Sequence, residues 1–419
     1  MKHFFLTAFW LLLAFDLSGQ VTLDECRTAA QLNYPLARQY RWIELSGQYT
    51  LENTMKKYLP QLSLSAKATY QSDVTHIPFD IPGIDFDGVP NTQYQTVLEL
   101  DQRIWDGGET SQQKKQVQAS TMERQKQVEV DMYAVNERVD QLFFSILLMD
   151  EQLRQNRLLM ENLERNLAAI DACRLNGTAS DADVDAVRVE ILHTRQEAVQ
   201  IQAMRKAYVR MLSLLAGKEW NEQTSFVCPS EPESDPLPIR RPELSWYEAR
   251  QHQLDIRRAG LKTGYLPKFS FFVQGGFGNP GLNMLENKAS FFYLAGVRLN
   301  WNFGSLYTLG NDRRKIDAEQ RQIETDRDVF LFNTRLQLTE QDGTIQALEQ
   351  QMKEDDEIIR LRTNIRKAAE VKAVNGTISV TEMLREVTAE SLAMQSKAAH
   401  RIEWLMHLYR QRHLTNSGE

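Results

Sequence analysis

Residues 132–170 read MYAVNERVDQLFFSILLMDEQLRQNRLLMENLERNLAAI. One series of residues in this stretch is spaced alternately three and four positions apart, and all but Asn156 are apolar: Met132, Val135, Val139, Leu142, Ile146, Met149, Leu153, Asn156, Met160, Leu163, Leu167 and Ile170. A mean spacing of 3.5 residues is typical of a coiled coil, because it keeps an apolar seam facing a neighbouring helix. Apolar residues beside the seam, such as Phe143 and Phe144, widen it, so the helix can contact two neighbours, as a ring of helices requires.

The helix that carries this seam is predicted to be long. Residues 109–175 contain neither Gly nor Pro, and helix interiors reject proline. At 1.5 Å per residue, this segment would be roughly 100 Å long. All twelve prolines of the chain lie in 35–90 or 229–280. A second long helical block is therefore expected in 281–419.

The chain contains a tandem duplication. Three landmarks recur in the same order: Leu59-Pro60 with Leu266-Pro267, Trp105-Asp106-Gly107-Gly108 with Trp301-Asn302-Phe303-Gly304, and Asn176-Gly177-Thr178 with Asn375-Gly376-Thr377. A more polar copy of the apolar seam follows the third offset, at Leu331, Leu338, Ile345, Leu348, Met352, Ile359 and Ala369. These landmarks predict a first repeat in 21–228 and a second in 241–414, joined by a Pro-rich linker at 229–240.

Each long helix is predicted to end at an Asn-Gly turn. Gly177 and Gly376 stand where a helix C-terminus favours a left-handed residue. Ser180 or Asp181 would then cap a second helix. Each repeat therefore contains an antiparallel helical hairpin.

The segments before each long helix alternate between apolar and polar residues, which predicts strands with one apolar face. The alternating apolar series are Leu62, Leu64, Ala66, Ala68 and Tyr70; Tyr94, Thr96, Leu98, Leu100 and Ile104; Phe269, Phe271 and Val273; and Phe291, Tyr293, Ala295, Val297, Leu299 and Trp301. Strands of about ten residues can cross a bilayer when tilted. Four strands cannot close a barrel alone, so a membrane barrel would need several chains. The alternative is a soluble two-stranded ribbon in each half, packed on the helices.

Residues 1–20 are interpreted as a signal peptide, because an apolar run of twelve residues at 4–15 is too short to span a bilayer comfortably. The alternative is a buried N-terminal helix. The net charge of −7 argues against a nucleic-acid-binding protein. After the N-terminus no run of 18 uncharged apolar residues occurs, which excludes a multi-helix membrane protein. Three cysteines are too few for a disulfide-built fold.

The landmarks resemble those of the TolC family of outer-membrane efflux proteins. The residues that carry the resemblance also include Leu23-Asp24-Glu25-Cys26 and Asn33-Tyr34-Pro35-Leu36, and together they cover nearly the whole chain after the signal. The resemblance implies a mainly α fold with membrane β: helical hairpins that form a periplasmic α-barrel, and four strands per subunit in the 12-stranded β-barrel of a homotrimer. It places the protein in the bacterial outer membrane, in contact with its lipid.

The resemblance also implies a function and site residues. The protein would be the passive duct of a tripartite efflux or secretion system, fed by an inner-membrane efflux pump through a periplasmic adaptor (membrane fusion) protein. Asp183 and Glu382 match acidic positions at the family's narrow periplasmic entrance, and Arg385 stands where the family often has a further acid. Arg385 could pair with Glu382 one helical turn away. The alternative for all three is a solvated helix N-terminus. The implied adaptor-docking residues are the turns themselves: Asn176, Gly177, Thr178, Asn375, Gly376 and Thr377.

No catalytic, cofactor-binding or metal-binding motif is predicted. The chain has no Gly-rich phosphate loop followed by Lys and no G-x-S-x-G elbow. His400 and His407 are seven apart on a predicted helix, which favours a surface or interhelical role over a metal site. An enzyme is therefore not expected. The open alternative to a duct is an exported soluble coiled-coil scaffold that tethers partners, and insertion into the outer membrane would distinguish the two.

Overall fold

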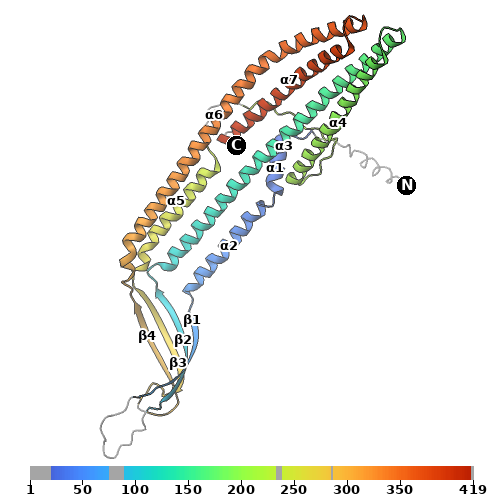
Figure 1. The fold of residues 1–419 in the computed structure, drawn as a ribbon. Helices are drawn as coiled ribbons and strands as arrows, with labels where there is room; N and C mark the ends of the chain where they lie inside the picture. The colour runs from blue at the N-terminus through green and yellow to red at the C-terminus, as the bar shows by residue number, and fades with distance from the viewer. Residues whose placement is uncertain (1–19, 75–88, 233–237, 285, 417–419) are drawn as a thin grey trace, which may run out of the picture. The chain divides into compact units, whose positions relative to one another are not determined.

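The computed structural model describes residues 20–74, 89–232, 238–284 and 286–416 (Figure 1). The predicted signal peptide therefore lies outside the described residues, except for Gln20. The elements in chain order are α1 (Leu23–Asn33), α2 (Ala37–Met55), η1 (Lys56–Tyr58), β1 (Gln61–Tyr70), β2 (Thr92–Trp105), α3 (Glu109–Leu175), α4 (Asp181–Ala216), α5 (Pro242–Gly260), η2 (Leu261–Gly264), β3 (Lys268–Asn279), β4 (Ser290–Asn300), α6 (Ser305–Val374) and α7 (Val380–Thr415). The predicted combination of long helices with four antiparallel strands is confirmed.

The described chain forms two units, each built from segments of both halves of the sequence. The hairpin unit comprises residues 20–39, 128–244 and 328–416. The strand unit comprises the described residues of 40–127 and 245–327. The helices α3 and α6 are continuous and contribute to both units.

The strand unit contains one sheet in the order β1-β2-β3-β4, with every neighbouring pair antiparallel. A register shift between Arg103 and Trp105 interrupts the pairing of β2 with β3 near the helical end. The four alternating segments of the sequence are strands, although Trp301 lies one residue beyond β4. A small apolar cluster of Leu254, Ile316 and Ile323 packs α5 against α6 in this unit.

The apolar seam of α3 lies in the core of the hairpin unit. Val139 and Ile146 are fully buried, and they belong to a cluster that includes Leu212 of α4, Leu405 of α7 and Cys26 of α1. The predicted seam residues that are buried are Val135, Val139, Leu142, Ile146, Asn156, Leu163 and Ile170. The coiled-coil interpretation of 132–170 is therefore confirmed.

The pairing of α6 with α7 is more polar, as its sequence suggests. His400 Nδ1 lies 3.0 Å from Asp355 Oδ2, and His407 Nδ1 lies 2.7 Å from Gln341 Oε1. Both histidines therefore have the interhelical role that their spacing favoured. In the same helix pair, Arg366 of α6 forms an ion pair with the buried Glu390 of α7.

Among the described residues no helix is long and apolar enough to cross a membrane. The cysteines Cys26, Cys173 and Cys228 are all free thiols. Burial raises the pKa of the Cys26 thiol to about 12, helped by the neighbouring carboxylate of Glu25. Cys26 therefore serves as an apolar side chain in the core and not as a reactive thiol.

An aromatic stack joins the C-terminal end of α7 to α3. The His413 ring lies parallel to that of Tyr133, with 4.2 Å between centroids, and Tyr133 donates its hydroxyl to the His413 carbonyl at 2.5 Å. Burial lowers the pKa of His413 to about 4, and the cations Arg241, Arg27 and Arg410 add to this effect. The neutral imidazole is thus the form that the folded chain stabilises.

We expect this histidine to make stability acid-sensitive. The unfolded chain protonates His413 near its ordinary pKa of about 6.5, whereas the folded chain does so only near 4. Stability is therefore full above about pH 6.5 and falls as pH decreases through this window, by up to about 3 kcal/mol. His413→Phe keeps the ring and should remove this part of the loss, measured as unfolding midpoints in detergent across the window. His193→Gln, on the exposed face of α4, is the control and should leave the loss unchanged. An equal loss in His413→Phe and the wild type would contradict the assignment.

Candidate functional site

The first hairpin turn has the geometry of a Schellman motif. Gly177 has φ of +77°, its N–H donates to the Arg174 carbonyl at 3.0 Å, and the Thr178 N–H donates to the Cys173 carbonyl at 2.9 Å. These two bonds satisfy carbonyls that the end of α3 would leave unpaired. The left-handed conformation predicted for Gly177 is therefore confirmed.

The second turn repeats this arrangement. Gly376 has φ of +69°, and the N–H groups of Gly376 and Thr377 donate to the carbonyls of Ala373 and Lys372 at 3.0 and 2.9 Å. In both turns the threonine hydroxyl donates to the same carbonyl as its own N–H, at 3.0 Å. The turn residues of both hairpins are exposed: Asn176, Gly177, Thr178, Asn375, Gly376 and Thr377. The two exposed tips thus share nearly the same turn geometry (Figure 1).

The three predicted entrance residues follow these tips: Asp183 and Glu382 lie in the first turns of α4 and α7, and Arg385 lies in the second turn of α7. Asp183 forms a capping box with Ser180: its Oδ2 accepts from the Ser180 N–H at 2.9 Å and from the hydroxyl at 2.7 Å. These two donors lower the pKa of Asp183. Glu382 is exposed, and its N–H donates to the Ser379 hydroxyl at 3.2 Å. Asp183 therefore has a structural role in α4 that Glu382 does not have in α7.

Arg385 does not pair with Glu382, contrary to the pairing considered from sequence. Its guanidinium lies 3.6 Å from the Glu386 carboxylate, and its side chain is 73% exposed. Glu386 also accepts from Arg362 of α6 at 3.3 Å, so it lies closer to α6 than Glu382 does. Within the described residues no hydrogen bond or ion pair joins Asp183, Glu382 and Arg385 to one another.

The two hairpins pack on each other just behind their tips. One apolar cluster takes residues from four helices: Leu159, Leu163, Ile170, Val184, Val187, Ile191, Ala369, Ala373, Val380, Met383, Leu384 and Val387. A cavity of about 260 Å³ lies beside it, lined by Ile170, Val374, Met383 and others. The side-chain nitrogen of Asn166, buried in the lining, has no hydrogen-bond partner among the described residues.

The sheet of the strand unit separates apolar from charged side chains. On β1 the exposed Leu62 and Leu64 lie on one face, and Lys67 lies on the other. The register extends this separation to the other strands. All charged residues of the four described strands lie on one face: Lys67, Glu99, Asp101, Arg103, Lys268 and Arg298.

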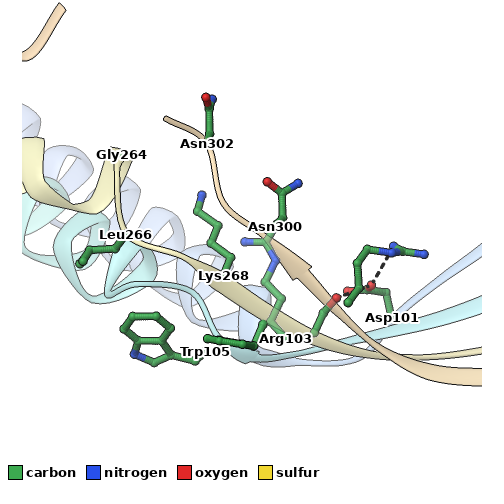
Figure 2. A pocket seen from close by; sticks show the side chains of 11 residues that line it. Asp101, Arg103, Trp105, Gly264, Leu266, Lys268, Asn300 and Asn302 are labelled. Carbon is green, nitrogen blue, oxygen red and sulfur yellow. Dashed lines mark hydrogen bonds and ion pairs between the residues drawn. The ribbon is translucent and has the colours of Figure 1, made fainter. Parts of the chain in front are cut away.

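A pocket of about 320 Å³ lies on the charged face where the strands meet the helices. Its lining includes Asp101 and Arg103 of β2, Lys268 of β3, and Arg298 and Asn300 of β4. Figure 2 shows Lys268 and Asn300 on one side of the strands and Trp105 on the other. These charged residues were not among the candidates predicted from the sequence, although their regular alternation with apolar residues could have indicated them.

Among the described residues no cluster of three His, Cys, Asp or Glu side chains is suited to hold a metal ion.

Comparisons with known proteins agree with this architecture. Residues 29–218 match the sequence model of the outer membrane efflux protein family. No curated protein matches the sequence significantly.

Solved structures resemble the chain over nearly its whole length. The outer-membrane channel OprN matches with a TM-score of 0.70 and 13% identity, covering 94% of this chain and 90% of OprN. The outer membrane protein VceC from Vibrio cholerae matches with a TM-score of 0.68 and 11% identity, covering 94% and 96%. The CmeC outer membrane channel of Campylobacter jejuni matches with a TM-score of 0.66 and 13% identity, covering 95% and 87%. At these identities the matches establish the fold.

Proposed function

We propose that this chain, whose residues 29–218 match the sequence model of the outer membrane efflux protein family, is the outer-membrane duct of a tripartite efflux or secretion system. The family match and the shared fold support an outer-membrane efflux channel whose helices lie on the periplasmic side. The proposal adds that it acts as a homotrimer, in which four strands from each subunit close a 12-stranded barrel. A periplasmic adaptor would connect it to an inner-membrane pump. Cargo would cross it passively, because the pump supplies the free energy.

The observation that carries this proposal is the separation of the two faces of the sheet. A barrel in a bilayer needs an apolar outer face and a polar inner face. Exposed side chains such as Leu64, Phe291 and Val297 cover one face, and every charged residue of the described strands lies on the other. A soluble ribbon packed on the helices would bury its apolar face, whereas here Leu64 is 71% and Phe291 is 86% exposed. The scaffold alternative is therefore not favoured.

We extend the proposal to the two halves of the sequence. Residues 21–228 and 241–414 would be structural repeats joined by the linker at 229–240, and the signal at 1–20 would be removed on export. Both repeats supply the same order of elements, from α2 to α4 and from α5 to α7. Two copies per subunit would give the trimer six equivalent hairpin tips.

The tips are proposed to dock the adaptor. Gly177, Thr178, Gly376 and Thr377 are exposed and held rigidly by Schellman bonds, so docking would order few new side chains. The cavity that contains the unpartnered Asn166 amide lies next to Asn375 and could receive one side chain of the adaptor.

Asp183, Glu382 and Arg385 are proposed to line the periplasmic entrance. Three-fold symmetry would bring each into a ring, and rings of charge control ion passage. Glu382→Ala and Arg385→Ala are both expected to raise single-channel conductance in planar bilayers, because each removes a side chain that restricts the entrance. Asp183→Ala is a poor test, since it would also remove the capping box at the start of α4. Wild-type conductance in both of the other variants would exclude them from the entrance.

The duct itself is tested by isolating the protein with its signal intact. Membranes are separated, extracted with detergent, and the purified particle is imaged by electron microscopy. We expect a three-fold particle from the outer-membrane fraction with a helical tube below a short barrel. A soluble periplasmic particle, or one without three-fold symmetry, would reject the trimeric duct.

A further inference from the structure

The charged face of the sheet contains a network that crosses three strands. Arg298 of β4 reaches β2, which is not its neighbour: its Nη2 lies 3.0 Å from Glu99 Oε1, and its Nη1 lies 3.4 Å from Asp101 Oδ2. To do so it passes over β3, where its guanidinium lies 4.7 Å from the centroid of the Phe272 ring. One cation therefore pairs with two carboxylates on a strand that lies beyond its neighbour, so this group of three keeps one net negative charge.

The strand between them orients these carboxylates. Gln274 of β3 donates its side-chain amide to Glu99 Oε2 at 2.9 Å. Ser270 of β3 donates its hydroxyl to Asp101 Oδ2 at 3.0 Å. The side chains of Glu99 and Asp101 are only 23% and 27% exposed, whereas that of Arg298 is 47% exposed. The carboxylates are thus fixed by β3, and the arginine is the more exposed partner.

A second group of charges lies at the helical end of the same face. Lys268 Nζ lies 2.6 Å from Glu109 Oε2 at the start of α3, and Arg103 Nη1 lies 3.9 Å from the same oxygen. Lys268, Arg103, Arg298 and Asp101 also line the pocket of about 320 Å³ (Figure 2). Together the two groups contain three acids and three bases: Glu99, Asp101, Glu109, Arg103, Lys268 and Arg298.

We propose that these six residues form a charge-balanced collar that faces the lumen and sets the ion selectivity of the duct, with Arg298 as the cation that pairs with Glu99 and Asp101. This inference rests on the proposed function, because the charged face lines a lumen only if the sheet closes into a barrel. It assigns the collar a role distinct from that of the periplasmic entrance. Small ions and charged cargo would pass a wall with alternating signs of charge and little net field.

Whether the duct becomes more selective for cations or for anions depends on which charge is removed. Without Arg298, Glu99 and Asp101 stay held by Gln274 and Ser270, so each subunit presents additional negative charge to the lumen. Rings of carboxylates favour cations. Without Glu99, Arg298 keeps Asp101 alone as its carboxylate partner, and the wall becomes more positive.

The test is the reversal potential of single trimers in planar bilayers, with about 0.01 M KCl on one side and about 0.1 M on the other, where the Debye length is roughly 30 and 10 Å. For Arg298→Gln we expect the permeability ratio of K⁺ to Cl⁻ to rise about twofold or more. For Glu99→Gln and Asp101→Asn we expect it to fall. In the double variant Glu99→Gln/Arg298→Gln the net charge is restored, so the ratio should return to near the wild-type value.

The set of variants distinguishes an effect of lumen charge from a failure to fold or assemble. If Arg298→Gln fails to assemble because the three-strand network is lost, Glu99→Gln and Asp101→Asn still test the sign in the opposite direction. Conducting channels whose permeability ratio is unchanged in all three single variants would overturn the collar while leaving the duct intact. A wild-type protein that forms no conducting pore would instead reject the proposed function.

Discussion

Replacing Asp140 with Ala is expected to lower the free energy of unfolding by about 3–5 kcal/mol. Arg27 of α1 donates to both carboxylate oxygens of Asp140 on α3, from Nε at 2.7 Å and from Nη2 at 2.6 Å. Their side chains are only 20% and 8% exposed. The variant would leave a guanidinium in a poorly hydrated site beside the Tyr409 ring, with only the solvent-exposed Asp24 carboxylate, 3.6 Å away, as a counter-charge. Urea unfolding followed by circular dichroism in detergent measures the loss.

Two controls test whether the loss comes from leaving a charge buried without its partner. Asp185→Ala breaks an exposed pair with Arg188, whose side chains are 61% and 68% exposed, and should cost less than about 1 kcal/mol. The double variant Arg27→Met/Asp140→Leu removes both charges and should lose much less than Asp140→Ala, because no charge stays buried alone. If Asp140→Ala costs no more than Asp185→Ala, water must reach Arg27 and the pair is not effectively buried.

Leu64→Arg is expected to prevent assembly in the outer membrane. Leu64 lies in the middle of β1 on the apolar face and pairs with Leu98. An arginine that faces lipid near the bilayer midplane costs about 2–4 kcal/mol per copy, and the proposed trimer would carry three copies. The yield of detergent-extracted trimer from the outer-membrane fraction is the measurement, and we expect it to fall at least tenfold.

Ser65→Arg is the matched control, because Ser65 is the next residue of the same strand and points to the charged face. Both positions are exposed in the single chain. In the isolated subunit the two variants should therefore behave alike. Their trimer yields should differ only if lipid covers the face of Leu64. Equal yields of the two variants would argue against lipid contact on the face of Leu64.

The strands show which features could be predicted from the sequence and which could not. The alternation of Leu62, Leu64 and Tyr70 with polar residues assigns each to a face without knowledge of any partner, because successive side chains of a strand point to opposite sides. It does not state which strands are neighbours. The order β1-β2-β3-β4 brings Arg298 to Glu99 across nearly 200 positions of sequence, and that contact depends on the register of two strand pairs.

The hairpin tips show the same limit at a smaller scale. The Asn-Gly turns and the cap at Ser180 were predictable, because Schellman motifs and capping boxes involve residues within five positions of each other. The ion-pair partner of Arg385 was not predictable from the sequence. Glu382 and Glu386 are both within reach on α7, and the choice between them depends on how α7 lies against Arg362 of α6.

The sequence by itself therefore determined the long helices, the turns, the strands and the faces of each, because helix and strand periodicities follow from local backbone geometry. The tertiary structure alone decided which charges meet across distant parts of the sequence. The bidentate pair of Arg27 with Asp140, the stack of His413 on Tyr133 and the pairing of Arg298 with Glu99 all join residues more than 100 positions apart. Such contacts depend on the packing of whole elements, which no local pattern encodes.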